Sequence, residues 1–233
     1  MRGRRLARST VVAVLGAGMA FLGPIVPSAS AEPCPDIEVV FARGTDEAPG
    51  VGGVGQSFVD AVRAQAGGRS VGAYAVNYAA SSNFADRMGF ASTVVDGIRD
   101  QGARVQFMAA NCPNTKLILG GYSQGAAVSG FVTSAVVPAG VPAELVPKPL
   151  PPEVAEHVAA VVLFGKPSGE FVSKYDAPAI DIGPLYAGKT LELCAQGDTI
   201  CEQVPDGGPT FAHVLYPMNG MVGEGAAFAV GRL

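Results

Sequence analysis

The sequence lacks tryptophan altogether and contains only two histidines and four cysteines among 233 residues. Metal sites such as those of zinc need histidine and cysteine ligands in close pairs, and neither residue type is paired in that way here. We therefore expect no metal and no cofactor. Long apolar runs are also missing beyond the N-terminal region. None approaches the roughly 20 residues that span a bilayer, so no membrane-spanning helix is expected there.

Basic residues are scarce once the N-terminal arginines are set aside. Residues 32–233 carry 12 basic and 20 acidic side chains, a formal net charge of −8. Such a surface has no electrostatic footprint for nucleic acid or for anionic lipid headgroups, which excludes both as partners. These 202 residues are enough for one sizeable core and few for two. We expect a single domain over residues 32–233, acting as a monomer.

The first 31 residues have the pattern of a secretory signal peptide. Four arginines precede an apolar stretch over residues 11–26, and Ala29-Ser30-Ala31 supplies the small residues that a signal peptidase recognises. An uncleaved N-terminal anchor is the alternative. We expect residues 1–31 to be removed and the mature protein to be exported, either free outside the cell or associated with the cell wall.

An even number of cysteines in an exported chain predicts disulfides. Four cysteines allow three pairings, so the count alone leaves the connectivity open. Cys194 and Cys201 enclose only six residues and would close one loop. Cys34 and Cys112 would then join the mature N-terminus to the segment before a predicted strand.

Strand and helix patterns alternate along the chain, which predicts a three-layer α/β sandwich around a parallel sheet. Strands are expected at residues 36–42, 71–76, 116–120, 158–164 and 190–194, and helices at 53–65, 86–109, directly after 125, and 218–230. Residues 136–152 are rich in proline without periodicity, which predicts a surface loop. In the longest helix, spacings of three and four predict one buried face: Met88, Ala91, Val95, Ile98, Gly102, Val105 and Ala109.

One pentapeptide carries the strongest chemical signal. Gly121-Tyr122-Ser123-Gln124-Gly125 follows the predicted strand at 116–120 and precedes small residues that begin a helix. A serine between a strand and a helix, flanked by glycines, is the sequence form of a nucleophile elbow. A glycine-rich turn without catalytic role is the alternative. The motif predicts acyl transfer with Ser123 as the nucleophile.

A serine hydroxyl needs a base to remove its proton, and only two histidines are available. His157 comes directly before the strand at 158–164, whereas His213 follows the last strand and its loop. In a parallel sheet the reactive edge lies at the carboxyl ends of the strands, where Ser123 also lies. We therefore predict His213 as the base and His157 as a surface residue.

The carboxylate that orients the histidine is expected between Ser123 and His213 in this chain order. Asp198 follows the last predicted strand between two cysteines, and a short disulfide loop there would hold its carboxylate rigidly. The other aspartates of this interval are Asp176, Asp181 and Asp206. Asp206, beside two glycines, is the main rival, although an ordinary turn also explains it.

Two donors are needed for the oxyanion of the tetrahedral intermediate. The residue after the nucleophile supplies one backbone N–H, here that of Gln124. The loop after the first strand supplies the second, and Thr45 lies there with both an N–H and a hydroxyl. Alternatively, Thr45 and Asp46 only cap the following helix.

These motifs together resemble the cutinase family of secreted serine esterases. The resemblance rests on Phe41-Ala42-Arg43-Gly44-Thr45, the elbow, the cysteine-flanked Gly197-Asp198 loop and the late His213. It implies a small α/β-hydrolase with five central strands and no large lid, and the disulfides Cys34–Cys112 and Cys194–Cys201. It also implies Ser123, Asp198 and His213 as the triad, with Thr45 and Gln124 in the oxyanion hole. The family often has serine at the position of Thr45, and Asn83 aligns loosely with an asparagine that holds this hydroxyl.

The expected activity is hydrolysis of short- to medium-chain aliphatic esters, with an ester or lipid as the only partner. We expect Phe211, Val214, Leu215 and Leu185 to line the acyl groove, although they would equally serve as loop anchors. Two alternatives remain at this point. One is an esterase that deacetylates polysaccharides such as acetylxylan, and the other is an inactive secreted binding protein or antigen on the same scaffold.

Overall fold

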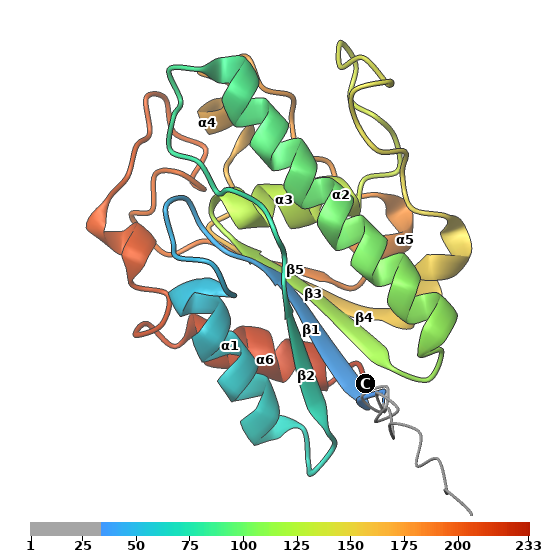
Figure 1. Ribbon diagram of the computed structural model, residues 1–233. Helices are drawn as coiled ribbons and strands as arrows, with labels where there is room; N and C mark the ends of the chain where they lie inside the picture. The colour runs from blue at the N-terminus through green and yellow to red at the C-terminus, as the bar shows by residue number, and fades with distance from the viewer. Residues whose placement is uncertain (1–33) are drawn as a thin grey trace, which may run out of the picture. The chain divides into compact units, whose positions relative to one another are not determined.

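Five parallel strands form the centre of the computed structural model, which describes residues 34–233 (Figure 1). The strand order is β2-β1-β3-β4-β5, and every neighbouring pair is parallel. The strands are β1 (Ile37–Ala42), β2 (Val71–Ala75), β3 (Lys116–Tyr122), β4 (Val158–Phe164) and β5 (Thr190–Leu193). The predicted α/β class with five central strands is thereby confirmed.

Helices cover both faces of the sheet, as the sequence predicts. Helices α1 (Gly52–Gln65) and α6 (Met221–Val230) pack on one face, and α2 (Arg87–Asn111) and α3 (Gln124–Val132) on the other (Figure 1). The shorter elements are η1 (Pro152–His157), α4 (Gly169–Ser173), α5 (Pro184–Ala187) and η2 (Phe211–Val214). The sheet and its two helical layers form a three-layer sandwich. Because all five strands are parallel, their carboxyl ends lie at one edge of the sheet.

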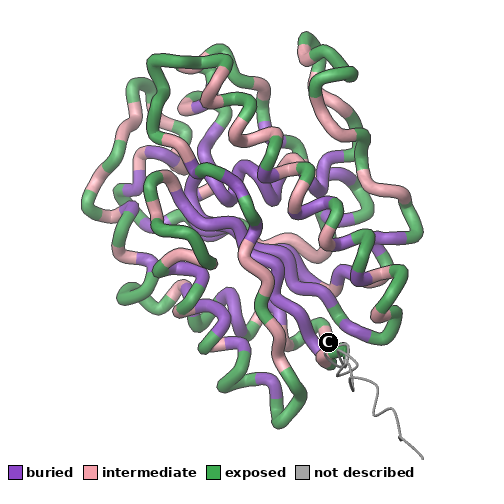
Figure 2. Tube along the Cα trace, in the orientation of Figure 1, coloured by how far each residue is buried: buried purple, intermediate pink, exposed green. Residues whose placement is uncertain are grey.

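The central strands β1, β3 and β4 are apolar except at Glu38 and Lys116, because both of their faces are covered. Every residue of β1 and nearly every residue of β3 and β4 is buried, whereas the edge strand β2 is mostly half-exposed (Figure 2). On the α1–α6 face, the rings of Phe41, Phe58 and Phe164 pack with centroids 5.4 to 6.3 Å apart. This rigid centre fixes the strand ends that carry the site.

Most predicted element boundaries agree with the structure within one or two residues. The final helix is the exception, because it begins at Met221 and not at residue 218. Gly220 lies in the left-handed region at φ 89°, and the Asn219 side chain accepts a hydrogen bond from the Met221 N–H at 3.0 Å. A turn therefore precedes the helix. Residues 136–151 form no helix or strand, as predicted for a surface loop.

The predicted buried face of α2 is only half buried. Gly102 and Val105 are buried, but Met88 is 74% exposed and Ala91 is also exposed. Helical periodicity indicates which residues share a face without indicating what covers it. The second half of α2 packs on the sheet, whereas the first half extends past α3 and faces a cavity. The prediction was wrong for Met88 and Ala91.

Two disulfides tie the ends of elements together. Cys34 is bonded to Cys112, which joins the chain before β1 to the end of α2. Cys194 is bonded to Cys201 and closes the loop after β5. These are the pairings that the cutinase resemblance implies, and they leave no unpaired cysteine in residues 34–233.

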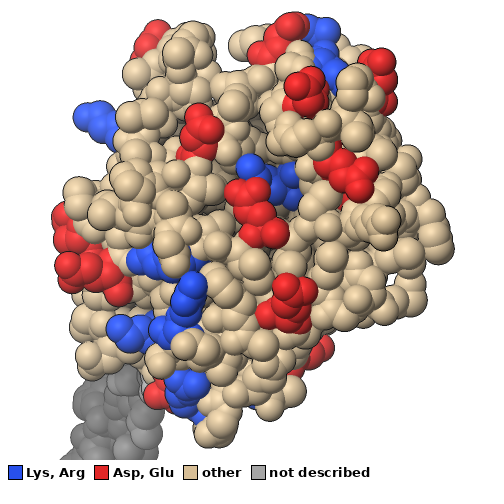
Figure 3. All heavy atoms as spheres, turned by 180° about the vertical axis from the view of Figure 1, so that it is seen from behind, with Lys and Arg blue, Asp and Glu red and all other residues tan. Residues whose placement is uncertain are grey.

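The predicted signal peptide, residues 1–31, lies outside the described residues. Within residues 34–233, no helix is both long and apolar enough to cross a membrane. Acidic and basic side chains are dispersed between wide uncharged areas on the face that Figure 3 shows.

Candidate active site

Ser123 occupies a strained turn between β3 and α3. Its backbone has φ 54° and ψ −117°, which is unusual for a residue with a side chain. A Cβ added to Gly121 would lie 2.1 Å from the Gly125 carbonyl oxygen, and one added to Gly125 would lie 2.0 Å from the Ala42 carbonyl oxygen. Both flanking glycines are therefore required by close backbone contacts, and the turn has the geometry of a nucleophile elbow.

Three side chains that are distant in sequence meet beside this turn. Ser123 Oγ lies 2.8 Å from His213 Nε2, and His213 Nδ1 lies 2.8 Å from Asp198 Oδ2. All three residues are buried, and Asp198 is completely so. They follow β3 or β5, at the carboxyl edge of the sheet. The contacts form a continuous route for a proton from the serine to the histidine.

The rival residues lie elsewhere. His157 ends η1 directly before β4, at the strand end opposite to Phe164, whose carbonyl accepts the Ser123 N–H at 2.9 Å. Asp206 is exposed in a turn at φ 55°. The structure therefore brings neither of them to Ser123.

Asp198 accepts more hydrogen bonds than the histidine alone supplies. Tyr216 Oη donates to Asp198 Oδ2 at 2.6 Å, and the Ile200 N–H donates to Oδ1 at 3.2 Å. Burial by itself would raise the pKa of Asp198, but the hydrogen bonds from His213 and Tyr216 outweigh burial and lower this pKa below its usual value. The carboxylate consequently stays ionised, with both oxygens held in place.

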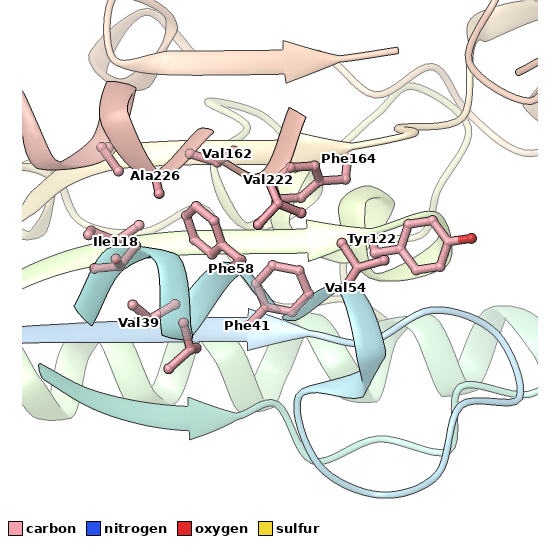
Figure 4. Packing of buried hydrophobic residues seen from close by; sticks show 14 of the residues in the cluster. Val39, Phe41, Val54, Phe58, Ile118, Tyr122, Val162, Phe164, Val222 and Ala226 are labelled. Atoms are coloured by element: carbon pink, nitrogen blue, oxygen red, sulfur yellow. The ribbon is translucent and has the colours of Figure 1, made fainter. Parts of the chain in front are cut away.

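Tyr122 and Gly165 also shape the surroundings of His213. The sequence analysis did not identify these two residues, nor Tyr216. Tyr122 Oη donates to the His213 carbonyl oxygen at 2.7 Å, and the two rings lie 5.0 Å apart. Figure 4 shows Tyr122 at the end of the core cluster, its hydroxyl directed away from the other labelled side chains. A Cβ on Gly165 would approach Asp198, His213 and Tyr216 to 3.0 to 3.1 Å. Of these three residues, only Tyr122 belongs to a sequence motif, the nucleophile elbow; Gly165 and Tyr216 belong to none.

We predict that Tyr216→Phe destabilises the protein in a pH-dependent way. Hydrogen bonds to charged groups contribute about 1.5–3 kcal/mol, and we expect a loss of this size in unfolding free energy at pH 7. Because the folded pKa of Asp198 is lowered, this contribution is present above the unfolded aspartate pKa of about 3.9. It disappears as the pH falls through the lower folded pKa. Urea unfolding at several pH values measures it.

Tyr122→Phe is the matched control, because its buried hydroxyl bonds a carbonyl and not a carboxylate. Its effect on stability is expected to be the same at neutral and acidic pH. If the loss of unfolding free energy depended on pH equally in both variants, the hydrogen bond from Tyr216 to Asp198 would not be its cause.

Thr45 and Gln124 lie at the same cavity as Ser123 and His213. Gln124 is the first residue of α3, where backbone N–H groups lack partners within the helix. Thr45 follows β1 in a turn that Glu47 stabilises, since its carboxylate accepts the N–H groups of Gly44 and Gly53 at 2.6 and 2.7 Å. Helix α1 begins at Gly52 after a Val51 cap, so Thr45 and Asp46 do not cap it.

Asn83 does not hold the Thr45 hydroxyl, the role that its loose alignment suggested. Its backbone N–H bonds the Ser81 hydroxyl at 3.1 Å, and within residues 34–233 its side chain makes no hydrogen bond to Thr45. The Gln124 side chain bonds the same segment, donating to the Ser81 carbonyl oxygen at 3.1 Å. The loop before α2 is thus linked to the start of α3 through Ser81.

An extensive apolar cavity of about 1080 Å³ opens beside the serine. Of the residues expected to line an acyl groove, Val214 does so, whereas Phe211, Leu215 and Leu185 do not. Phe211 is 75% exposed, and Leu185 belongs to α5 on another part of the surface. The prediction was wrong for these three because chain proximity to His213, or apolar character alone, does not fix a side chain's neighbours. Much of the lining comes from α2, α3 and residues 136–150.

Metal ligands are not grouped in the described part of the chain, where no cluster of three or more histidine, cysteine, aspartate or glutamate residues could hold an ion.

The parallel five-stranded sheet with helices on both faces, and with a serine elbow at a strand end, defines an α/β-hydrolase fold. The chain belongs to the cutinase family of serine carboxylic-ester hydrolases: the family model described as Cutinase matches residues 33–233.

Named relatives agree with this assignment. The chain is 60% identical to "Probable carboxylesterase Culp7" of Mycobacterium tuberculosis over 169 residues, covering 72% of this chain and 88% of that protein. It is 42% identical to "Phospholipase Culp4" of the same species over 230 residues, covering 99% and 92% respectively. Among solved structures, a Trichoderma reesei cutinase in complex with a phosphonate inhibitor is 30% identical, with a TM-score of 0.60, covering 85% of this chain and 77% of that one.

Proposed function

We propose that Ser123, His213 and Asp198 act as a catalytic triad that hydrolyses short- to medium-chain aliphatic esters. The observation that carries this proposal is the pair of 2.8 Å contacts that link Ser123 Oγ through the imidazole of His213 to Asp198. A hydroxyl becomes nucleophilic when an oriented base accepts its proton, and this geometry supplies both the base and its orientation.

The reaction follows from these contacts. Ser123 Oγ attacks the ester carbonyl carbon while His213 Nε2 takes the hydroxyl proton. The tetrahedral intermediate collapses, the bond to the alcohol oxygen breaks, and His213 returns the proton to the leaving alcohol. Water then attacks the acyl-enzyme, with its proton passing to the same nitrogen, and the carboxylic acid is released as Ser123 regains its proton. Asp198 stabilises the imidazolium in each half-reaction.

Two groups are suited to stabilise the oxyanion. The Gln124 N–H lies at the start of α3, where the helix dipole favours negative charge. Thr45 lines the same cavity and lies in a turn fixed by Glu47 and by the hydrogen bond from the Asp46 N–H to the Ala80 carbonyl oxygen at 2.8 Å. Such fixed donors need little reorganisation during the reaction. We assign Gln124 and Thr45 to the oxyanion hole.

The cellular setting belongs to the same proposal. We assign residues 1–31 to a cleaved signal peptide and residues 32–233 to one exported catalytic domain, acting as a monomer outside the cell or at the cell wall. The two disulfides support this, because disulfides persist in oxidising compartments. Mass spectrometry of protein recovered from the culture medium tests the cleavage site, and a mature chain that retains residues 1–31 would contradict it.

Fluorophosphonate labelling separates an active hydrolase from an inactive binding protein. We expect one covalent adduct on Ser123 in folded mature protein, because the probe reacts with an activated serine. Folded protein without an adduct would favour the binding protein. Acetate release from acetylated xylan, compared with hydrolysis of p-nitrophenyl butyrate, tests the polysaccharide alternative. Activity restricted to acetyl groups would overturn the aliphatic-ester proposal.

A further inference from the structure

The cavity beside Ser123 extends far beyond the reacting groups. Its volume of about 1080 Å³ lies just above the roughly 300–1,000 Å³ found for small-molecule sites. Thr45, Ser123 and His213 line one end, whereas Gly102 and residues 145–150 line another part. An acetyl or butyryl group would occupy only the space next to the serine. The remainder has room for a much longer group.

One face of α2, from its exposed start to the buried Gly102, forms one wall of this cavity. Ala91, Val95, Ile98 and Gly102 all line it and share one helix face. Ala91 and Gly102 are eleven residues apart, which corresponds to about 17 Å along an α-helix. One leaflet of a bilayer has a hydrocarbon depth of about 15 Å. The wall is therefore about as long as the acyl chain of a membrane lipid.

The cavity runs along helix α3 from Ser123. Ala127 and Phe131, one helical turn apart, line it after Ser123. Gln101 Nε2 donates to Ser129 Oγ at 3.0 Å, which places the later part of α3 beside the middle of α2. The cavity therefore leads from the serine, at the start of α3, toward the region of Gly102.

Gly102 lets Leu150 approach α2 closely. Gly102 is buried, and an added Cβ would lie 3.7 Å from Leu150 Cδ2, an ordinary contact distance. Glycine is unfavourable within a helix relative to alanine. The position therefore gives up helix propensity, and a side chain larger than a methyl group there would push against Leu150 at the cavity wall.

Residues 136–150 complete the far wall. The guanidinium of Arg99 donates to the Leu145 carbonyl oxygen at 2.5 Å, which holds this segment against α2. The Leu145 side chain is 51% exposed and lines the cavity. Figure 1 shows the segment beside α2. The lining prolines cannot donate backbone hydrogen bonds: Pro138, Pro142, Pro147 and Pro149.

We propose that Gly102, Leu145 and Leu150 form a distal subsite that binds the far end of a long acyl chain, whose ester carbonyl lies at Ser123. This inference rests on the proposed function, and it extends the substrates from medium-chain esters to long-chain lipid esters. A polysaccharide would place hydroxyl groups against this largely apolar wall, where they would lose hydrogen bonds to water. The lining therefore selects an aliphatic chain.

The test compares p-nitrophenyl butyrate with p-nitrophenyl palmitate. Each buried methylene contributes up to about a fourfold increase in kcat/KM, so the wild-type protein should prefer palmitate strongly. Leu145→Asp places a charge in the distal subsite and should lower the palmitate-to-butyrate ratio of kcat/KM by about tenfold or more. Leu185→Asp is the matched control, since Leu185 is 52% exposed and lies outside the cavity; its ratio should equal that of the wild type.

Gly102→Leu provides a second variant, because its side chain would push Leu150 into the subsite. The two side chains would displace several methylenes of the substrate, and we expect the ratio to fall about 50-fold, mainly through the KM for palmitate. An unchanged ratio in folded Leu145→Asp, or an equal fall in Leu185→Asp, would overturn the distal subsite. Wild-type protein that hydrolyses butyrate without preferring palmitate would also overturn it, while leaving the proposed function intact. No hydrolysis of either ester would refute the proposed function itself.

Discussion

Replacing Ser123 or His213 with alanine is expected to lower kcat on the order of 10⁶-fold. In the proposed mechanism the two residues act as one unit, because the serine is activated through the 2.8 Å contact with His213 Nε2. Either single change should therefore cost about as much as both together. Residual turnover above the uncatalysed rate would come from the proposed oxyanion donors, Gln124 and Thr45. Initial rates with p-nitrophenyl butyrate measure the effect.

Thermal denaturation and His157→Ala supply the controls. Ser123→Ala should keep a melting temperature near that of the wild type, because the Ser123 side chain bonds only His213 within the described residues. His213→Ala should remain folded with a lower melting temperature, because the buried Asp198 carboxylate loses the hydrogen bond from Nδ1. His157→Ala should keep nearly normal activity, because His157 lies before β4, at the opposite end of the strands from the site. Loss of activity in His157→Ala with full activity in His213→Ala would reverse the assignment of the base.

Parallel topology made the arrangement of the site predictable from sequence. Each candidate residue follows a strand: Thr45 follows β1, Ser123 follows β3 and Asp198 follows β5. Residues in these positions gather at one edge whatever the details of packing. The scarcity of histidine then reduced the search for a base to two residues. These inferences needed only the order of elements and the direction of the strands.

The apolar cavity was not predictable in the same way. A helical stripe in α2 indicates a face that avoids water, and burial against the sheet was the simplest explanation. Met88 and Ala91 instead face a cavity, whose other wall is the irregular segment at residues 136–150. No periodicity or turn motif fixes where such a segment lies. The position depends on tertiary contacts such as the one between Arg99 and the Leu145 carbonyl.

The residues that support the triad were missed for a related reason. Tyr216 and Gly165 matter only because the loops after β4 and β5 meet His213 in space. A tyrosine three residues after the histidine has no motif of its own, and a glycine after a strand has many explanations. Their contribution becomes visible only when the distances around Asp198 are known.

Those distances lead to a second large expected effect: Asp198→Asn should lower kcat about 10⁴-fold. Asp198 Oδ2 accepts hydrogen bonds from His213 Nδ1 and Tyr216 Oη, and Oδ1 accepts one from the Ile200 N–H. The amide of asparagine has one accepting oxygen and one donating nitrogen. If its nitrogen faces His213, the imidazole must place its proton on Nε2, and it then cannot accept the serine proton. If its nitrogen faces Ile200, two donors oppose each other in a buried site.

Either orientation costs stability, because a buried donor is left without an acceptor. Either orientation also costs activity, because the neutral amide lacks the negative charge that stabilises the imidazolium. We therefore expect Asp198→Asn to lower the free energy of unfolding by about 1–3 kcal/mol, unlike Ser123→Ala. Asp206→Asn is the control, since Asp206 is exposed in a turn and should affect neither quantity. Steady-state kinetics and urea unfolding of the three variants measure both effects. Near-normal activity of Asp198→Asn would show that His213 keeps its tautomer without the carboxylate, and the role assigned to Asp198 would then be wrong.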